Sequence, residues 1–125
     1  MFCNQCEQTA KGIGCTVMGV CGKNEGVASI EDLLTHAVQG LCLIATEGRK
    51  VGVIDNKVDR FACEAIFSCL TNVDFDPARF QEWIKKTVAL REELKSKVKA
   101  AGGKVDFNTP AANFTPADSL SGLEA

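Results

Sequence analysis

Four cysteines lie within the stretch MFCNQCEQTAKGIGCTVMGVCGK, and they are the residues of this chain with the clearest capacity for chemistry. Their spacing is Cys-x2-Cys-x8-Cys-x5-Cys, formed by Cys3, Cys6, Cys15 and Cys21. A Cys-x2-Cys pair is short enough to direct both sulfurs at one metal ion or at one face of a cluster. Four thiolates satisfy a [4Fe–4S] or a [2Fe–2S] cluster, and they also satisfy tetrahedral zinc. The spacing therefore predicts a metal centre with these four cysteines as its ligands.

Two features favour iron–sulfur chemistry over zinc. The second half of the motif is Cys-x5-Cys, whereas most paired zinc knuckles repeat Cys-x2-Cys. Glycines around the last two cysteines would let backbone N–H groups approach inorganic sulfides closely; they are Gly12, Gly14, Gly19 and Gly22. Large apolar residues could also shield a cluster from water, namely Phe2, Ile13, Val17 and Val20. From the spacing alone, zinc stays the second interpretation, and a disulfide-bonded or metal-free segment the third.

The composition shows neither an export signal nor a basic surface. The 125 residues are 46% hydrophobic and 24% charged, with a net charge of −2, which argues against a nucleic-acid partner. Apolar runs such as LCLIA at 41–45 are much shorter than the ~20 residues that cross a bilayer, and no apolar signal region follows the first residues. We therefore expect a cytoplasmic protein without a membrane partner. Stable disulfides are rare there, and seven cysteines cannot all pair.

Sequence patterns divide the chain into residues 1–28, 29–102 and 103–125. The first part has no sustained helical or strand period, so it is predicted to be an irregular cluster-binding segment in which the metal replaces a hydrophobic core. The second contains three apolar-striped stretches with short connections, which predicts a three-helix up-down-up bundle. The third, with its prolines and small polar residues, is expected to be an extended tail, although TPADSL resembles a capped helix start. The expected fold class is all-α.

Each predicted helix begins beside a residue that can cap it. The first is expected to start at Ser29, with Asp32 three positions later completing a capping arrangement. The second is expected to begin after Asp55. The third has Asp76 followed directly by proline, a favourable residue for the first helical turn, and a Gly-Gly pair at its end.

The remaining cysteines and the single histidine are predicted to be structural. Cys42 and Cys69 lie on apolar stripes, and free cysteine is among the most frequently buried residue types. Cys63 and Cys69 are six positions apart, roughly 240° around a helix, so they do not readily share a metal. His36 lies opposite the apolar stripe of the first helix and is expected to face solvent.

The cysteine-rich segment closely resembles the N-terminus of the hybrid cluster protein family, also called prismane proteins or hydroxylamine reductases. In that family an MFCxQCEQT start and a GCTxxGVCGK continuation supply the proximal cluster, and both motifs stand in this sequence. The likeness continues more weakly through EDLL at 31–34, LTN at 70–72 and DPARF at 76–80. It implies a [4Fe–4S] cluster on Cys3, Cys6, Cys15 and Cys21, because the branch associated with [2Fe–2S] has longer gaps.

The same resemblance implies roles for nearby polar residues. Gln5, Gln8 and Thr9 stand in step with the family motif, which implies hydrogen bonds to the cluster sulfurs. The alternative is that they are ordinary polar residues of a loop.

Family members run to several hundred residues, and their hybrid iron–sulfur–oxygen cluster is ligated from later α/β domains. There hydroxylamine is reduced to ammonia and water, and none of those ligands maps onto this chain. The resemblance implies that the chain is the electron-relay part of such an enzyme, without catalytic residues of its own. Its partners would be the remaining domains of the parent enzyme, reached through the tail 103–125, and an electron-donor protein. The alternative is a zinc-stabilised helical interaction module without redox function.

Overall fold

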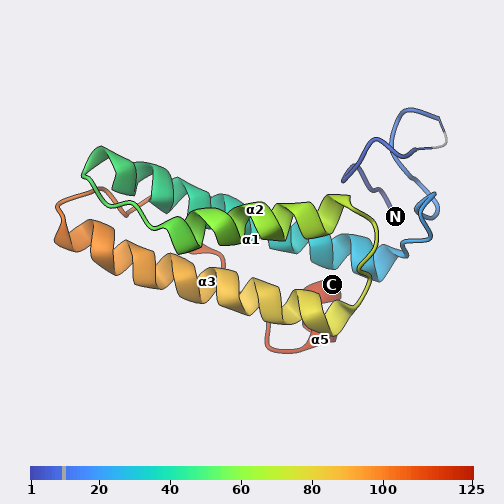
Figure 1. Ribbon diagram of the computed structural model, residues 1–125. Helices are drawn as coiled ribbons and strands as arrows, with labels where there is room; N and C mark the ends of the chain where they lie inside the picture. Colours follow the sequence, from blue (N-terminus) through green and yellow to red (C-terminus); the bar gives the residue numbers. More distant parts are fainter. Residues whose placement is uncertain (10) are drawn as a thin grey trace.

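Three long helices lie side by side, and the cysteine-rich segment projects at one end of them (Figure 1). The structure is a computed structural model that describes residues 1–9 and 11–125; Ala10, in the predicted cluster-binding segment, lies outside the described residues. The long helices are α1 (Glu25–Lys50), α2 (Asn56–Leu70) and α3 (Pro77–Ala100), and two short ones follow, α4 (Pro110–Asn113) and α5 (Leu120–Glu124). The predicted all-α class is confirmed.

α1 begins one turn earlier than predicted. The side chain of Asn24 caps it by accepting a hydrogen bond from the Val27 N–H at 2.9 Å. Ser29 and Asp32 therefore lie inside the helix, and their expected capping role was wrong. The additional turn is stabilised because it buries Val27 and Ala28, apolar surface that the shorter helix would leave outside the fold.

The starts of α2 and α3 are those that the sequence predicted. The Asp55 side chain accepts hydrogen bonds from the N–H groups two and three positions ahead, at 3.0 and 3.4 Å. Asp76 caps α3 in the same way at 3.0 Å, with proline in the first turn. α3 ends before Gly102, whose φ of +82° lies in the left-handed region that glycine adopts without strain.

One core joins the three long helices. Its buried side chains include Ile30, Leu34, Leu41, Ile44, Phe61, Ala65, Phe80, Ile84, Leu94 and Val98. α1 contributes to the contacts with both of the other long helices, while Phe61 of α2 and Trp83 of α3 stack with ring centroids 5.3 Å apart. The core depends on none of the four predicted ligands, so the helices have an apolar source of stability of their own.

The C-terminal segment 103–125 is packed against α1, so the expectation of an extended tail was wrong. α4 lies on α1 at Gly40, where a Cβ would meet a backbone carbonyl of α4. α5 begins where the TPADSL pattern indicated, and Ala112 and Leu123 are buried. Helices of four or five residues are too short to show an apolar period, so their packing on α1 could not be predicted from a pattern.

Two side chains differ in exposure from the prediction. Cys42 is exposed, because Leu41 and Ile44 take the core-facing positions of that part of α1. His36 is half-buried under the C-terminal segment, edge-on to the ring of Phe114 at 5.5 Å. Cys69 is buried as predicted.

α1 is long and apolar enough, by length and composition, to cross a membrane. Its most apolar 18-residue window has a mean hydropathy of 1.3, which a search for short continuous apolar runs overlooks. Of that window, 56% is buried inside the fold, a property of core helices. The absence of a membrane partner stays a prediction.

Candidate metal centre

Two of the four predicted ligands lie side by side in the cysteine-rich segment. Cys3 and Cys15 exchange both backbone N–H···O hydrogen bonds, each at 2.9 Å, in an isolated antiparallel bridge. In such a pair the Cα atoms are about 5.5 Å apart and both side chains lie on the same side. Both residues are buried at 8% exposure, and they pack with Ala28 of α1 in a small cluster separate from the main core.

The other two predicted ligands, Cys6 and Cys21, are half-buried. The N–H of Gln8 donates to Cys6 Sγ at 3.4 Å, while the Cys15 thiol donates to the Gln8 carbonyl at 4.0 Å, so both sulfurs flank one residue. Cys21 Sγ lies against Gly19, where a Cβ would come within 3.1 Å of the sulfur. Gly19 therefore leaves room for the Cys21 thiol, whereas the approach of glycine N–H groups to inorganic sulfides stays a prediction.

No disulfide occurs in the part of the chain that the structure describes, and all seven cysteines are free. Over residues 1–9 and 11–125, no group of three or more His, Cys, Asp or Glu side chains could hold a metal ion. Tetrahedral zinc with Zn–S bonds of about 2.3 Å needs sulfurs about 3.8 Å apart, whereas a cluster of several irons and sulfides sits between its thiolates and separates them. Within the described residues, the four thiols do not converge on one point.

Two separate hollows lie beside the predicted ligands, each next to a different cysteine. One hollow of about 200 Å³ borders Cys15 and is lined in part by Val17 and Val20. A second, of about 310 Å³, borders Cys6. With N–H groups at the sulfurs and four thiols in one short segment, the donor set matches the chemistry of an iron–sulfur cluster.

The apolar residues that were predicted to shield a cluster are exposed. Phe2, Ile13, Val17 and Val20 show 61%, 67%, 88% and 52% exposure. The segment is a single layer of irregular backbone, so these side chains have no second layer to pack against. Exposed apolar side chains gathered near a predicted redox centre indicate a contact surface.

A buried ion pair, which sequence reasoning missed, joins the segment to the long helices. The Lys23 ammonium contacts the Glu31 carboxylate and donates to Gln5 Oε1 at 2.6 Å and to the Cys69 carbonyl at 3.3 Å. Lys23 is 1% exposed and Glu31 is 0% exposed. The only sequence signal was the family motif, which includes this lysine.

Gln5 completes the same junction instead of directing its side chain at a sulfur. Its amide donates to the Ala28 carbonyl at 2.8 Å and to Asp32 Oδ1 at 2.9 Å. Its backbone N–H and the charge of Lys23 both lower the pKa of the Cys3 thiol, but burial outweighs them and the pKa is raised. A positively charged metal beside the sulfurs would stabilise the thiolate form of Cys3 and so offset the effect of burial.

Burial also raises the pKa of Glu31, from 4.5 to about 7, against the lowering effect of Lys23. The folded state therefore holds a proton that the unfolded chain releases between about pH 4.5 and 7. Across this window the wild-type free energy of unfolding should fall relative to that of Glu31→Gln, by at most about 1.4 kcal/mol per pH unit. Urea unfolding of both proteins at several pH values measures the difference, and parallel curves would contradict it.

Comparison with known proteins adds to this geometry. Residues 1–121 match the Prismane/CO dehydrogenase family. The chain is 65% identical over 125 residues to a hydroxylamine reductase of Syntrophobacter fumaroxidans, 50% over 123 residues to one of Methanocella arvoryzae, and 40% over 124 residues to one of Desulfitobacterium hafniense. These matches cover 100%, 98% and 99% of this chain. The chain spans about a quarter of the length of these curated relatives, 23% of each.

Proposed function

The chain belongs to the Prismane/CO dehydrogenase family, and from this premise we propose that it is the N-terminal electron-relay part of a hydroxylamine reductase. Cys3, Cys6, Cys15 and Cys21 hold a [4Fe–4S] cluster in this proposal. The observation that carries it is the arrangement of the thiols. Cys3 and Cys15 are buried and paired through their backbones, and the sulfurs of Cys6 and Cys15 both contact Gln8. The Gln8 N–H donates to the Cys6 sulfur.

The bound cluster would supply reversible one-electron transfer, and the chain's residues determine where and how easily that occurs. Buried Cys3 and Cys15 anchor it against the first turn of α1. Burial raises the pKa of the Cys3 thiol, and a backbone N–H opposes that rise in part. The N–H of Gln8 donates to the Cys6 sulfur, as it could to a metal-bound thiolate. Lys23 lies close enough to lower the pKa of Cys3, so it adds a positive charge near the negative centre.

A relay needs contacts on two sides, and the exposed apolar side chains provide candidate surfaces. Phe2 and Leu70 border a hollow of about 400 Å³ between the segment and the ends of α1 and α2. Phe67 and Val73 nearby along the chain are 64% and 84% exposed. We assign these surfaces to the remaining domains of the parent enzyme and to an electron-donor protein, in a cytoplasmic setting.

The chemistry of hydroxylamine reduction belongs to the remainder of the parent enzyme in this proposal. The relatives that carry the name hydroxylamine reductase are about four times as long as this chain, which covers 23% of them. The isolated 125 residues should therefore show no hydroxylamine turnover. The zinc-stabilised interaction module is not favoured, because the chain belongs to the Prismane/CO dehydrogenase family and its relatives are named hydroxylamine reductase.

Redox titration of anaerobically prepared protein tests the relay. We expect one reversible one-electron reduction, with a low-temperature EPR signal that appears on reduction and disappears on reoxidation. The same protein after removal of iron is the control and should give no signal. A protein that takes up no electron would contradict the relay, and hydroxylamine turnover by the chain alone would show that the catalytic centre is assigned wrongly.

A further inference from the structure

Asn72 brings a hydrogen-bond donor to one of the predicted ligands from a distant part of the chain. It lies in the turn between α2 and α3, and its Nδ2 donates to Cys6 Sγ at 3.1 Å across 66 positions of sequence. Cys6 Sγ also accepts the N–H of Gln8, at the longer distance of 3.4 Å. The side chain of Asn72 therefore provides the shorter of the two hydrogen bonds to this sulfur.

The backbone of Asn72 is specialised for this position. Its φ of +55° makes it the only non-glycine residue with a positive φ among those that the structure describes. Asparagine tolerates the left-handed region better than most residues with a side chain. Glycine would satisfy the turn equally well, so the backbone alone does not require an amide here.

The amide has the orientation that a metal-bound thiolate requires. A thiolate sulfur can only accept hydrogen bonds, so the NH₂ group must face it and the carbonyl must point away. Asn72 Oδ1 is buried and, within the described residues, has no hydrogen-bond partner. An unpaired buried acceptor costs free energy, which the contact between Nδ2 and the sulfur must offset.

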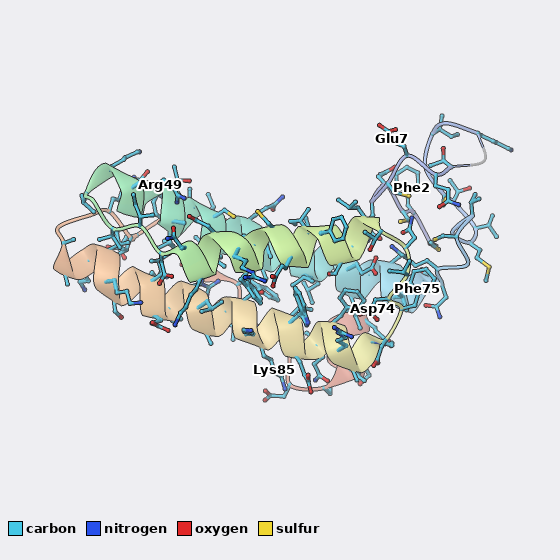
Figure 2. All side chains as sticks on the ribbon, in the orientation of Figure 1. Phe2, Glu7, Arg49, Asp74, Phe75 and Lys85 are labelled. Carbon is cyan, nitrogen blue, oxygen red and sulfur yellow. The ribbon has the colours of Figure 1, made fainter. Side chains whose placement is uncertain are left out.

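The turn that carries Asn72 lies between two contacts of Lys23, one before it in the sequence and one after it. Lys23 Nζ donates to the carbonyl of Cys69 at the end of α2 and lies 5.7 Å from the ring centroid of Phe75. Figure 2 shows Phe75 and Asp74 in this turn, beside the start of α1. The donor is therefore held in place by the same buried junction that anchors the segment.

We propose that Asn72 tunes the cluster, its Nδ2–H donating to the Cys6 sulfur and stabilising the reduced state. The inference rests on the proposed function and adds to it. Reduction places an additional electron on the cluster, so hydrogen bonds to its sulfurs strengthen and the reduction potential rises. Asn72 is a positioning residue, since it acts through the ligand Cys6.

Two variants separate this effect from the conformation of the turn. Asn72→Gly keeps the positive φ without strain and removes the donor, whereas Asn72→Asp keeps the shape and places a carboxylate beside the sulfur. We expect the reduction potential to fall in the order wild type, Asn72→Gly, Asn72→Asp. For Asn72→Gly the ratio of reduced to oxidised cluster at a fixed applied potential should fall about tenfold, which is about 59 mV for one electron. Thr71→Ser, a change next to Asn72 that alters neither the charge nor the amide, is the control and should leave the potential unchanged.

A second measurement does not need the cluster. In iron-free, reduced protein, the Asn72 amide covers one side of the Cys6 sulfur, so Asn72→Gly should expose that sulfur and speed its alkylation by iodoacetamide. Mass spectrometry of the digested protein gives the rate at Cys6 alone, and circular dichroism checks that helix content is kept. An unchanged rate would overturn the contact.

The outcomes of the two proposals are distinguishable. Equal potentials in wild type and Asn72→Gly, with full iron content in both, overturn the inference about Asn72 and leave the relay standing. A wild-type protein that binds no iron overturns the proposed function, and the tuning role fails with it.

Discussion

Cys15→Ser is expected to lose the cluster, with iron and acid-labile sulfide falling at least tenfold relative to wild type. Cys15 is 8% exposed and backbone-paired with Cys3, so its sulfur occupies the interior of the site. Serine keeps the size and the backbone bridge but replaces a soft thiolate by a poor ligand for iron. Iron and sulfide determinations on anaerobically prepared protein measure the effect.

The same variant should loosen residues 1–28 without melting the long helices. The only buried apolar cluster in the described part of that segment consists of Cys3, Cys15 and Ala28, too few residues to fix its conformation without a metal. The helices keep the separate core around Leu34, so far-ultraviolet circular dichroism should change little. Cys63→Ser, at an exposed cysteine of α2, is the matched control and should keep full iron content. Retention of stoichiometric iron by Cys15→Ser would contradict the ligand assignment.

At about pH 8, where the Glu31 carboxylate is charged, Lys23→Met is expected to lower the free energy of unfolding by about 3–5 kcal/mol, the range found when one partner of a buried ion pair is removed. The change leaves the Glu31 carboxylate buried at 0% exposure, with one oxygen already unpaired in the described structure. Gln5 Oε1 and the Cys69 carbonyl lose the same donor. Urea unfolding of anaerobic protein, followed by circular dichroism, measures the loss.

A double variant shows whether charge or packing is responsible. Lys23→Met combined with Glu31→Leu removes both charges from the buried site and should recover most of the lost stability. Arg60→Met is the control, because Arg60 pairs with Glu64 on the exposed side of α2 and should show no measurable change. If Lys23→Met matched this control, the junction would not carry the stability assigned to it.

Local signals in the sequence predicted most of the fold. The starts of α2 and α3 follow from Asp55 and Asp76, whose carboxylates reach N–H groups only two or three residues ahead. The four-cysteine spacing predicted which thiols share a segment, because all four lie within nineteen residues of sequence. The start of α1 was missed because two polar residues could each cap it, and only the burial of Val27 and Ala28 decides in favour of Asn24.

Local sequence signals did not predict the contacts between residues that are distant along the chain. Nothing local to Lys23 shows that it is buried against Glu31 and the end of α2, since that depends on where the helices place their ends. The contact of Asn72 with Cys6 spans 66 positions and depends on the turn after α2 returning to the segment. The sequence thus identified the candidate ligands, while their hydrogen-bond environment required the fold.

The most direct test of the iron–sulfur assignment is the metal and sulfide content of the wild-type chain prepared without oxygen. We expect about four iron and about four acid-labile sulfide per chain, with zinc absent. One zinc per chain without sulfide, or a metal-free chain with its first four cysteines in disulfides, would contradict it.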